Sequence, residues 1–170
     1  MEILKAIRER RSIRNFRKKD IPEEIVDKLI DSLIWAPSAG NLQARKFFFV
    51  KDAKLKKGIA TAALNQDFIA EAPLVIVGCT DSRISNKYGD RGESLYSIQD
   101  VAASIMGMML VAYDNGLGTV WVGAFREEEV FDLLRLPQNL RPIAIVPVGY
   151  PVEIPPPPPR VSREDAVKFQ

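Results

Sequence analysis

The feature that most constrains the fold is the stretch from Ser94 to Asp114, SLYSIQDVAASIMGMMLVAYD, which is apolar on nearly every side of a helix. This pattern is typical of a central helix buried on most sides. A chain of 170 residues, of which 46% are hydrophobic, is long enough to build one domain around such a helix. We therefore expect a single domain over residues 1–150, followed by a proline-rich spacer and C-terminal arm of the same domain over residues 151–170.

The rest of the chain mixes strand and helix patterns. Apolar runs typical of strands occur at 46–50, 74–79, 119–125 and 142–151, and helical patterns follow Asp20, Asp52 and Phe125. We expect Asp20 to cap the first of these helices. The polar stretch 80–92, TDSRISNKYGDRG, predicts a mobile loop that could act as a lid. Intermixed helices and strands predict an α/β sandwich.

Composition removes several classes of chemistry. The chain has no histidine and one cysteine, which excludes Ser-His-Asp and Cys-His catalysis and argues against a conventional zinc site. Cys79 lies in the apolar run PLVIVGCT, which predicts a buried thiol and a reducing compartment. The N-terminus lacks a signal-peptide pattern and no segment is long enough to span a bilayer, so we expect a soluble cytoplasmic protein with no membrane partner.

Positive charge is concentrated in one segment, RERRSIRNFRKK, at residues 8–19. The segment carries +6, so the remainder of this +2 chain is at −4. One compact cluster favours a small anion over a nucleic acid, although sequence alone leaves RNA and an anionic membrane open. Arg10, Arg11 and Arg14 surround Ser12, a set that can grip a terminal phosphate; the alternative is a solvated helix end.

Two further segments suit a flat ligand. WAPSAGNLQARKFFFV places Asn41 and Gln43 between a helix end and a strand, and NGLGTVWVGAF places glycines beside a short buried run. Each could equally be an ordinary loop. The five prolines 155–159 predict a stiff polyproline II spacer with a short tail beyond it, for which an SH3-type ligand is the rival interpretation.

Together, and in this order, these motifs resemble the nitroreductase-like family of FMN-dependent NAD(P)H oxidoreductases. The family's Arg-Arg-Ser-x-Arg-x-Phe and Ala-Pro-Ser-x-x-Asn-x-Gln motifs are matched at 10–16 and 36–43, Asn-Gln before Ala-Pro at 65–73, a helix Asp at Asp100, Gly-Leu-Gly-x-x-Trp-x-Gly at 116–123, and a late Arg at Arg160. Two departures stand out. Ala44 and Arg45 replace the usual Pro-Trp, which bears on substrate preference, and Pro158 stands where many members carry a Lys near the phosphate.

The resemblance implies an α+β fold, with a central mixed, mostly antiparallel sheet flanked by helices and a C-terminal arm exchanged in a homodimer. FMN would lie at the dimer interface. The implied cofactor-binding residues are Arg10, Arg11, Ser12 and Arg160 at the phosphate and ribityl end, Arg14 toward the pyrimidine edge, Asn65 on the ring or ribityl, Gly123 and Ala124 toward flavin N5, and Pro37, Ser38, Ala39 and Asn41 from the partner chain.

The implied reaction is a ping-pong cycle in which NADH or NADPH gives hydride to flavin N5 and a small acceptor, such as a nitroaromatic or quinone, then takes the electrons. No catalytic side chain and no metal ligand is expected, and no nucleic-acid partner. The alternatives are other FMN chemistry, such as dehalogenation, enoate reduction or flavin destruction, and a non-catalytic flavin-binding or protein-interaction module.

Overall fold

A four-stranded antiparallel sheet is the centre of the computed structural model, which describes residues 2–170. Its strands lie in the order β1 (Arg45–Val50), β2 (Leu74–Asp81), β4 (Leu140–Gly149) and β3 (Gly118–Thr119). β1 is an edge strand that pairs only with β2, whereas β2 and β4 form the middle of the sheet. Every residue of β2 is buried, as expected for a strand covered on both faces.

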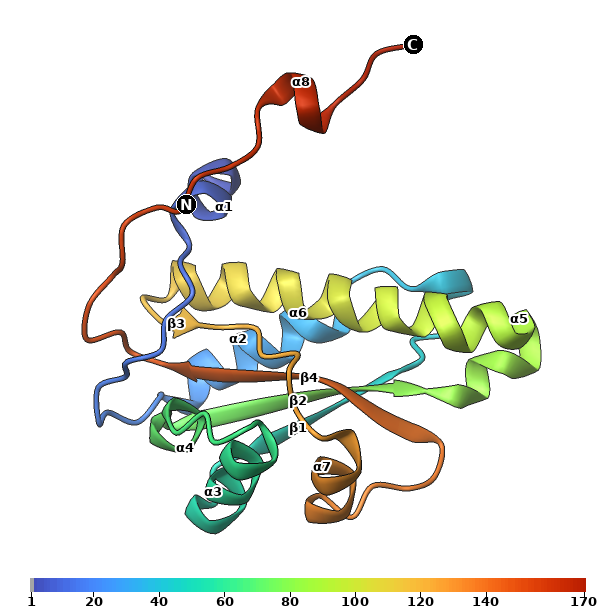
Figure 1. The fold of residues 1–170 in the computed structure, drawn as a ribbon, viewed down its shortest axis with the longest axis horizontal. Coiled ribbons are helices and arrows are strands. Elements are labelled where there is room, and N and C mark those ends of the chain that lie inside the picture. The colour runs from blue at the N-terminus through green and yellow to red at the C-terminus, as the bar shows by residue number, and fades with distance from the viewer. Residues whose placement is uncertain (1) are drawn as a thin grey trace.

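Helices cover both faces of this sheet (Figure 1). One layer contains α2 (Glu23–Ile34) and α6 (Ser97–Asp114), which share a core with the sheet. The other contains α3 (Ala53–Ala62), α4 (Phe68–Glu71) and α7 (Glu127–Leu133) over a second core. The remaining helical elements are α1 (Ile3–Glu9), η1 (Ala39–Asn41), η2 (Ser82–Ile84), α5 (Ser85–Arg91), η3 (Gly92–Tyr96) and α8 (Arg163–Ala166). The predicted sandwich is confirmed.

The first helices begin for different reasons. The carboxylate of Asp52 caps α3 by accepting a hydrogen bond from the backbone N–H of Leu55 at 2.8 Å. The predicted cap at Asp20 is wrong, because α2 begins at Glu23 after Pro22 and has no side-chain cap. Pro22 is the residue before the first turn, and the acidic Glu23 and Glu24 of that turn interact favourably with the positive end of the helix.

The predicted mobile loop at 80–92 is also wrong. β2 continues to Asp81, and η2, α5, η3 and α6 then follow one another directly along the chain, with a kink inside α5 at Gly89. The Asp81 carboxylate accepts from the backbone N–H of Arg83 and so starts this helical run. The predicted strand at 119–125 is shorter than expected: only Gly118–Thr119 is a strand, and Val122 adds an isolated bridge to Ile145.

The joined helices overturn a further expectation. The helical run Ser82–Asp114 is long and apolar enough, by length and composition alone, to cross a membrane. The expectation that no segment could do so was based on 94–114 as a separate helix. In the fold, α6 buries Val101, Ile105 and Met108 against the sheet and α2, as a core helix does. Its other flank is open, with Met106 39% exposed, so α6 is buried less completely than predicted.

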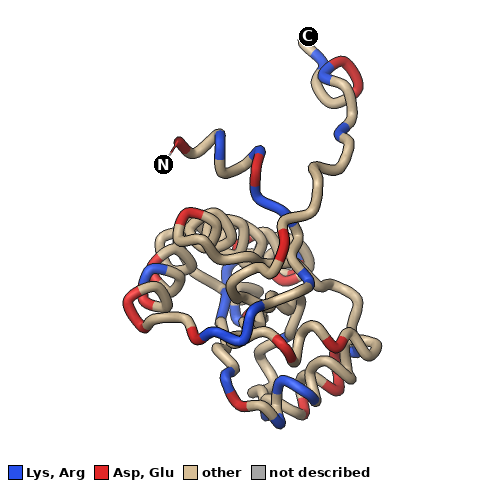
Figure 2. Tube along the Cα trace, turned by 90° about the vertical axis from the view of Figure 1, so that its left-hand side faces the viewer, with Lys and Arg blue, Asp and Glu red and all other residues tan. Residues whose placement is uncertain are grey.

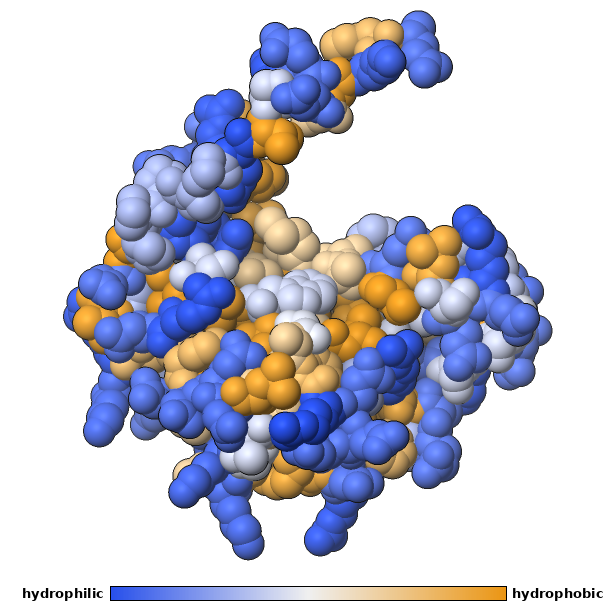
Figure 3. Space-filling view, in the orientation of Figure 1, coloured by the Kyte–Doolittle hydropathy of each residue, from blue (hydrophilic) through white to orange (hydrophobic). Residues whose placement is uncertain are grey.

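The C-terminal arm leaves the body after Tyr150. Its start is tied to the N-terminal segment, because the N–H of Val152 donates to the carbonyl of Asn15 at 3.0 Å. From residue 152 onward every residue is exposed, and the arm stands away from the body (Figures 1 and 3). Figure 3 shows a hollow between this arm and the helical layer beneath it. Phe169 at the tail is 93% exposed, so the arm presents apolar surface with nothing on it.

Candidate functional site

Two arginines just past the end of α1 carry buried donors with no acceptor. The Nε and Nη1 atoms of Arg10 and the Nε atom of Arg11 have no hydrogen-bond partner among residues 2–170. Among residues 2–170, Arg11 forms side-chain hydrogen bonds only through Nη1, which donates to the carbonyls of Arg8 at 2.7 Å and Arg10 at 2.9 Å. A buried donor left unpaired costs roughly 1–3 kcal/mol, so these groups reduce the stability of the folded chain unless an acceptor from outside it pairs with them.

The C-terminal arm brings a third cation to the same place. Burial, followed by the positive charges of Arg160 and Arg11, lowers the pKa of Arg10 from its ordinary value. Arg160 is itself held by the polyproline segment, since its Nη1 donates to the carbonyls of Pro158 and Pro159. Lys and Arg recur along the N-terminal segment where it passes from α1 into the body (Figure 2). Arg160, which directly follows the five prolines, is therefore close enough for its charge to act on Arg10.

Ser12 and Arg14 extend the cluster along the sheet. The N–H of Ile13 donates to the carbonyl of Thr119 at 3.0 Å, and Ser12 forms a parallel bridge with Thr119. This close approach requires Gly118, where a Cβ would lie 2.5 Å from the Cγ1 of Ile13. The Arg14 guanidinium sits over the ring of Phe68 at 5.9 Å. A pocket of about 230 Å³ opens beside Ser12 and Arg14.

The turn after α3 lies against the glycine-containing segment 123–124. Asn65 adopts a left-handed backbone with φ of 61°. The Nε2 of the next residue, Gln66, donates to the carbonyls of Ala63 at 2.8 Å and Ala124 at 3.3 Å. Gly123 and Ala124 are exposed. Gln66 was not among the predicted site residues, although the Asn-Gln pair pointed to it. In the structure its side chain joins the turn after α3 to segment 123–124.

The Pro37–Asn41 loop is held in a strained backbone by polar contacts. Gly40, Asn41 and Gln43 all have positive φ, at 53°, 55° and 52°. The carboxylate Oδ1 of Asp100 accepts from the N–H of Ala39 at 2.9 Å, and the hydroxyl of Ser38 accepts from the N–H of Gln43 at 3.0 Å. Strained, over-determined loops of this kind are found at ligand sites.

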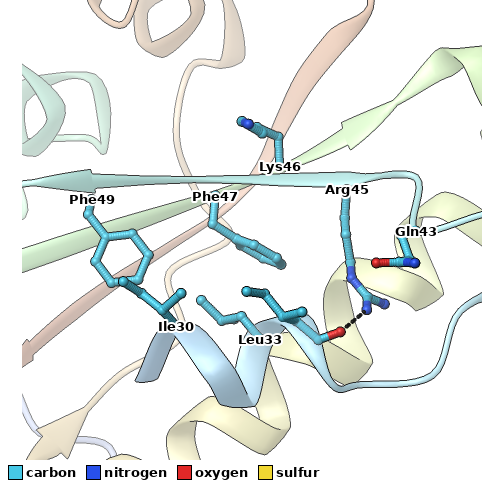
Figure 4. Close-up of a pocket in the computed structure, with 8 residues that line it drawn as sticks. Ile30, Leu33, Gln43, Arg45, Lys46, Phe47 and Phe49 are labelled. Carbon is cyan, nitrogen blue, oxygen red and sulfur yellow. Dashed lines mark hydrogen bonds between the residues drawn. The ribbon is translucent and has the colours of Figure 1, made fainter. Parts of the chain in front are cut away.

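Arg45 also holds this loop in place through hydrogen bonds. The sequence analysis related this residue only to substrate preference. Its guanidinium donates to the carbonyls of Ile34 at 3.0 Å, Ala36 at 2.6 Å and Pro37 at 2.9 Å. Burial lowers the pKa of Arg45, and the charge of Asp100 acts in the opposite direction. Figure 4 shows Arg45 reaching from β1 to the end of α2, beside a pocket of about 370 Å³ lined by apolar side chains of both elements.

The predicted residues thus form three groups. One is the turn at Asn65 with segment 123–124, and the other two, the Pro37–Asn41 loop and the arginine cluster, lie at opposite ends of α6. The Pro37–Asn41 loop is fixed to Asp100 in the first turn of this helix, whereas the arginine cluster packs beside Gly118, just past its end. An 18-residue helix is about 27 Å long at 1.5 Å per residue. Within one chain, the loop and the arginine cluster are therefore about a helix length apart.

Comparison with known proteins gives this geometry a context. The sequence model of the protein family described as "Nitroreductase family" matches residues 7–66 and 60–150. The FMN reductase (NAD(P)H) of Bacillus subtilis is 29% identical over 183 residues, which cover 99% of this chain and 73% of the relative. The NADH dehydrogenase of Thermus thermophilus is 30% identical over 172 residues, covering 85% of this chain and 84% of the relative.

Solved structures give the same result. The nitroreductase family protein from Clostridium novyi NT superimposes with a TM-score of 0.81 at 32% identity, covering 89% of this chain and 86% of that one. The structure of B. megaterium NfrA2 superimposes with a TM-score of 0.90 at 27% identity, covering 99% of this chain and 74% of that one. The predicted α+β class is confirmed. All strand pairs are antiparallel, and the one parallel pairing among residues 2–170 is the bridge from Ser12 to Thr119.

Proposed function

Because this chain belongs to the nitroreductase family, we propose that it is an FMN-dependent oxidoreductase that takes hydride from NADH or NADPH and passes the electrons to a small acceptor such as a nitroaromatic or quinone. The observation that carries the proposal is the set of buried guanidinium donors on Arg10 and Arg11 with Arg160 close by. None of these three cations forms an ion pair with a carboxylate among residues 2–170. Such a set fits a phosphate group, which pairs with guanidinium in a bidentate manner.

We propose that these residues hold FMN along its length. Arg10, Arg11, Ser12 and Arg160 would hold the phosphate and ribityl end, Arg14 the pyrimidine edge, Asn65 the ring or ribityl, and the backbone of Gly123 and Ala124 the region of N5. Bound flavin supplies the hydride chemistry, while the protein supplies binding, orientation and electrostatics. A cation such as Arg14 near the pyrimidine edge favours the anionic reduced cofactor.

We propose further that the site is completed by a second copy of the chain. Pro37, Ser38, Ala39 and Asn41 lie about the length of α6 from the arginine cluster of the same chain, so the partner's loop would meet this chain's cluster. The apolar surface left open supports a homodimer: Ile3, Leu4 and Ile7 on α1, Met106 on α6, and Phe169 in the arm are all exposed. Residues 151–170 would form an arm exchanged across this interface.

The absence of histidine bears on proton transfer. With no imidazole in the chain, a proton for the product would come from water, the cofactor or another side chain, and no protein acid is assigned to the step. The protein's part is therefore to bind, orient and exclude water. A soluble cytoplasmic location remains part of the proposal.

The decisive experiment is a spectrum of the purified protein after addition of FMN and removal of the excess, followed by anaerobic addition of NADH or NADPH. We expect retained bands near roughly 370 and 450 nm that either nucleotide bleaches. Retained flavin that neither nucleotide bleaches would favour other FMN chemistry, and no retained flavin would refute the proposal. Light scattering should give twice the 19.0 kDa mass of one chain.

A further inference from the structure

Two tyrosines and two cations form a cluster at the α5 end of the molecule. The rings of Tyr88 and Tyr96 meet edge to face, with centroids 5.4 Å apart and planes at 84°. The Nζ of Lys87 lies 5.5 Å from the Tyr88 centroid, and the guanidinium carbon of Arg91 lies 5.5 Å from the Tyr96 centroid. The Nε of Arg91 also donates to the Tyr96 hydroxyl at 3.0 Å. We call these four side chains the aromatic–cationic cluster.

This cluster lies against the Pro37–Asn41 loop. A Cβ placed on Gly40 would stand 2.3 Å from the Tyr88 hydroxyl oxygen and 3.4 Å from the Nζ of Lys87. The Tyr88 hydroxyl therefore packs directly on the backbone of Gly40. Any other residue at position 40 would displace this tyrosine side chain. Because the proposed function puts this loop along the flavin ring, the aromatic–cationic cluster flanks the place where a substrate would approach the ring.

The two cations have no carboxylate partner. Lys87 and Arg91 are exposed, and neither takes part in an ion pair within residues 2–170. The acidic residues of the neighbouring turns, Asp90 and Glu93, line a separate pocket with Arg141, and the charge of Glu93 helps to raise the pKa of Arg141. The positive charge beside the tyrosines is therefore available to a ligand.

We propose that the aromatic–cationic cluster binds a planar aromatic ligand that carries an anionic group. A tyrosine ring would stack on or edge against the ligand, and Lys87 and Arg91 would pair with its anion. The proposal rests on the proposed function and narrows its substrate class. Two molecules in the proposed reaction could present an aromatic ring together with an anionic group. One is an acceptor bearing a sulfonate or carboxylate, and the other is NADPH, through its adenosine phosphate.

The test compares a double variant, Lys87→Gln with Arg91→Gln, with a control of equal charge change, Lys54→Gln with Lys57→Gln, on α3 in the other layer. For each protein, kcat/KM is measured for 1,4-naphthoquinone-2-sulfonate and 1,4-naphthoquinone at saturating NADH, and for NADPH and NADH with the neutral quinone. We expect the sulfonate-to-neutral ratio, or the NADPH-to-NADH ratio, to fall about tenfold in the cluster variant and to stay unchanged in the control. The ratio that falls identifies the source.

A measurement without turnover separates this proposal from the proposed function. Naphthalene-2-sulfonate is titrated calorimetrically into the FMN-treated oxidised protein, with no nucleotide present. We expect wild-type binding to weaken with added salt and to weaken about tenfold in the cluster variant. Such a loss supports the site even if neither quinone is reduced. The proposal is overturned if binding and both kinetic ratios are the same in the two double variants.

Discussion

Replacing Arg10 by methionine should stabilise the protein without flavin while weakening its hold on FMN. In the structure Arg10 buries two guanidinium nitrogens without acceptors and faces two other cations. Methionine keeps much of the length and apolar stem of the side chain but removes the unpaired donors and the charge. One substitution thus acts in opposite directions on the two forms of the protein.

The expected magnitudes follow from these contacts. Each unpaired donor costs roughly 1–3 kcal/mol when fully buried. Arg10 is only half-buried, so the net gain for the flavin-free protein is discounted to about 1 kcal/mol, or a rise in Tm of roughly 2–4 °C. Losing charge-assisted hydrogen bonds to a phosphate costs about 1.5–3 kcal/mol, which weakens FMN binding by roughly 10- to 100-fold.

The assay is a thermal unfolding series with and without FMN, together with a fluorescence titration of FMN. A ligand that binds only the folded state raises stability with its concentration, so wild type should gain more from FMN than the variant. The order of the two Tm values should therefore reverse between the flavin-free and flavin-saturated protein. Lys18→Met, an exposed cation of the same basic segment, is the control and should change neither quantity appreciably. A flavin-free Arg10→Met protein that unfolds several degrees below wild type would refute the reasoning.

Three more outcomes follow from single side chains. Arg45→Met should destabilise the protein by about 2–4 kcal/mol in denaturant unfolding, because three backbone carbonyls at the end of α2 and just after it lose a charged donor. Lys46→Met on the exposed side of β1 should change stability by under about 0.5 kcal/mol. Hydrogen bonds from Arg83 and Asn139 lower the pKa of Asp81 from 3.8 to about 2. The ionised carboxylate therefore contributes on the order of 1 kcal/mol to the free energy of unfolding, after allowance for the exposed Arg83, above about pH 4, and this contribution is lost as pH falls toward 2. The stability difference between wild type and Asp81→Asn should vanish over that window. Burial raises the pKa of Cys79 to about 12, so a thiol reagent at pH 8 should label it only after unfolding, and rapid labelling of the folded protein would contradict the buried position.

Much of the fold was predictable because its strands and helices differ in the period of their apolar residues. The runs at β1, β2 and β4 and the stripe of α2 were recognised in this way. The segment 80–92 failed because a helix exposed on most sides and broken by Gly89, with φ of 56°, has neither an apolar period nor helix-favouring composition. Its helical state depends on the cap at Asp81 and on packing against η3.

The candidate site was predictable only in part. Residues that belong to a sequence motif can be recognised from the sequence, whereas residues that hold two distant segments together cannot. The arginines around Ser12 were recognised from charge and from the resemblance, and the structure brings Arg160 to them. Arg45 was noted only as a departure from a motif, and its bonds to three carbonyls at the end of α2 are a tertiary feature that no spacing reports. The contact between Tyr88 and Gly40 likewise joins residues far apart in the sequence.

The apolar segment that dominates the sequence also determines how the site is divided. The Pro37–Asn41 loop is bound to Asp100 in the first turn of α6, and the last turn of this helix leads to Gly118, on which the arginine segment packs. A rigid helix about 27 Å long keeps these half-sites apart in one chain, whereas an antiparallel second copy, packed along the open flank of α6, would bring the loop of each chain toward the cluster of the other. The proposed homodimer would therefore account for both the incomplete burial of α6 and the separation of the two groups of residues. We therefore propose that the flank which sequence analysis expected to be covered by the same chain is the surface on which a second chain would complete the site.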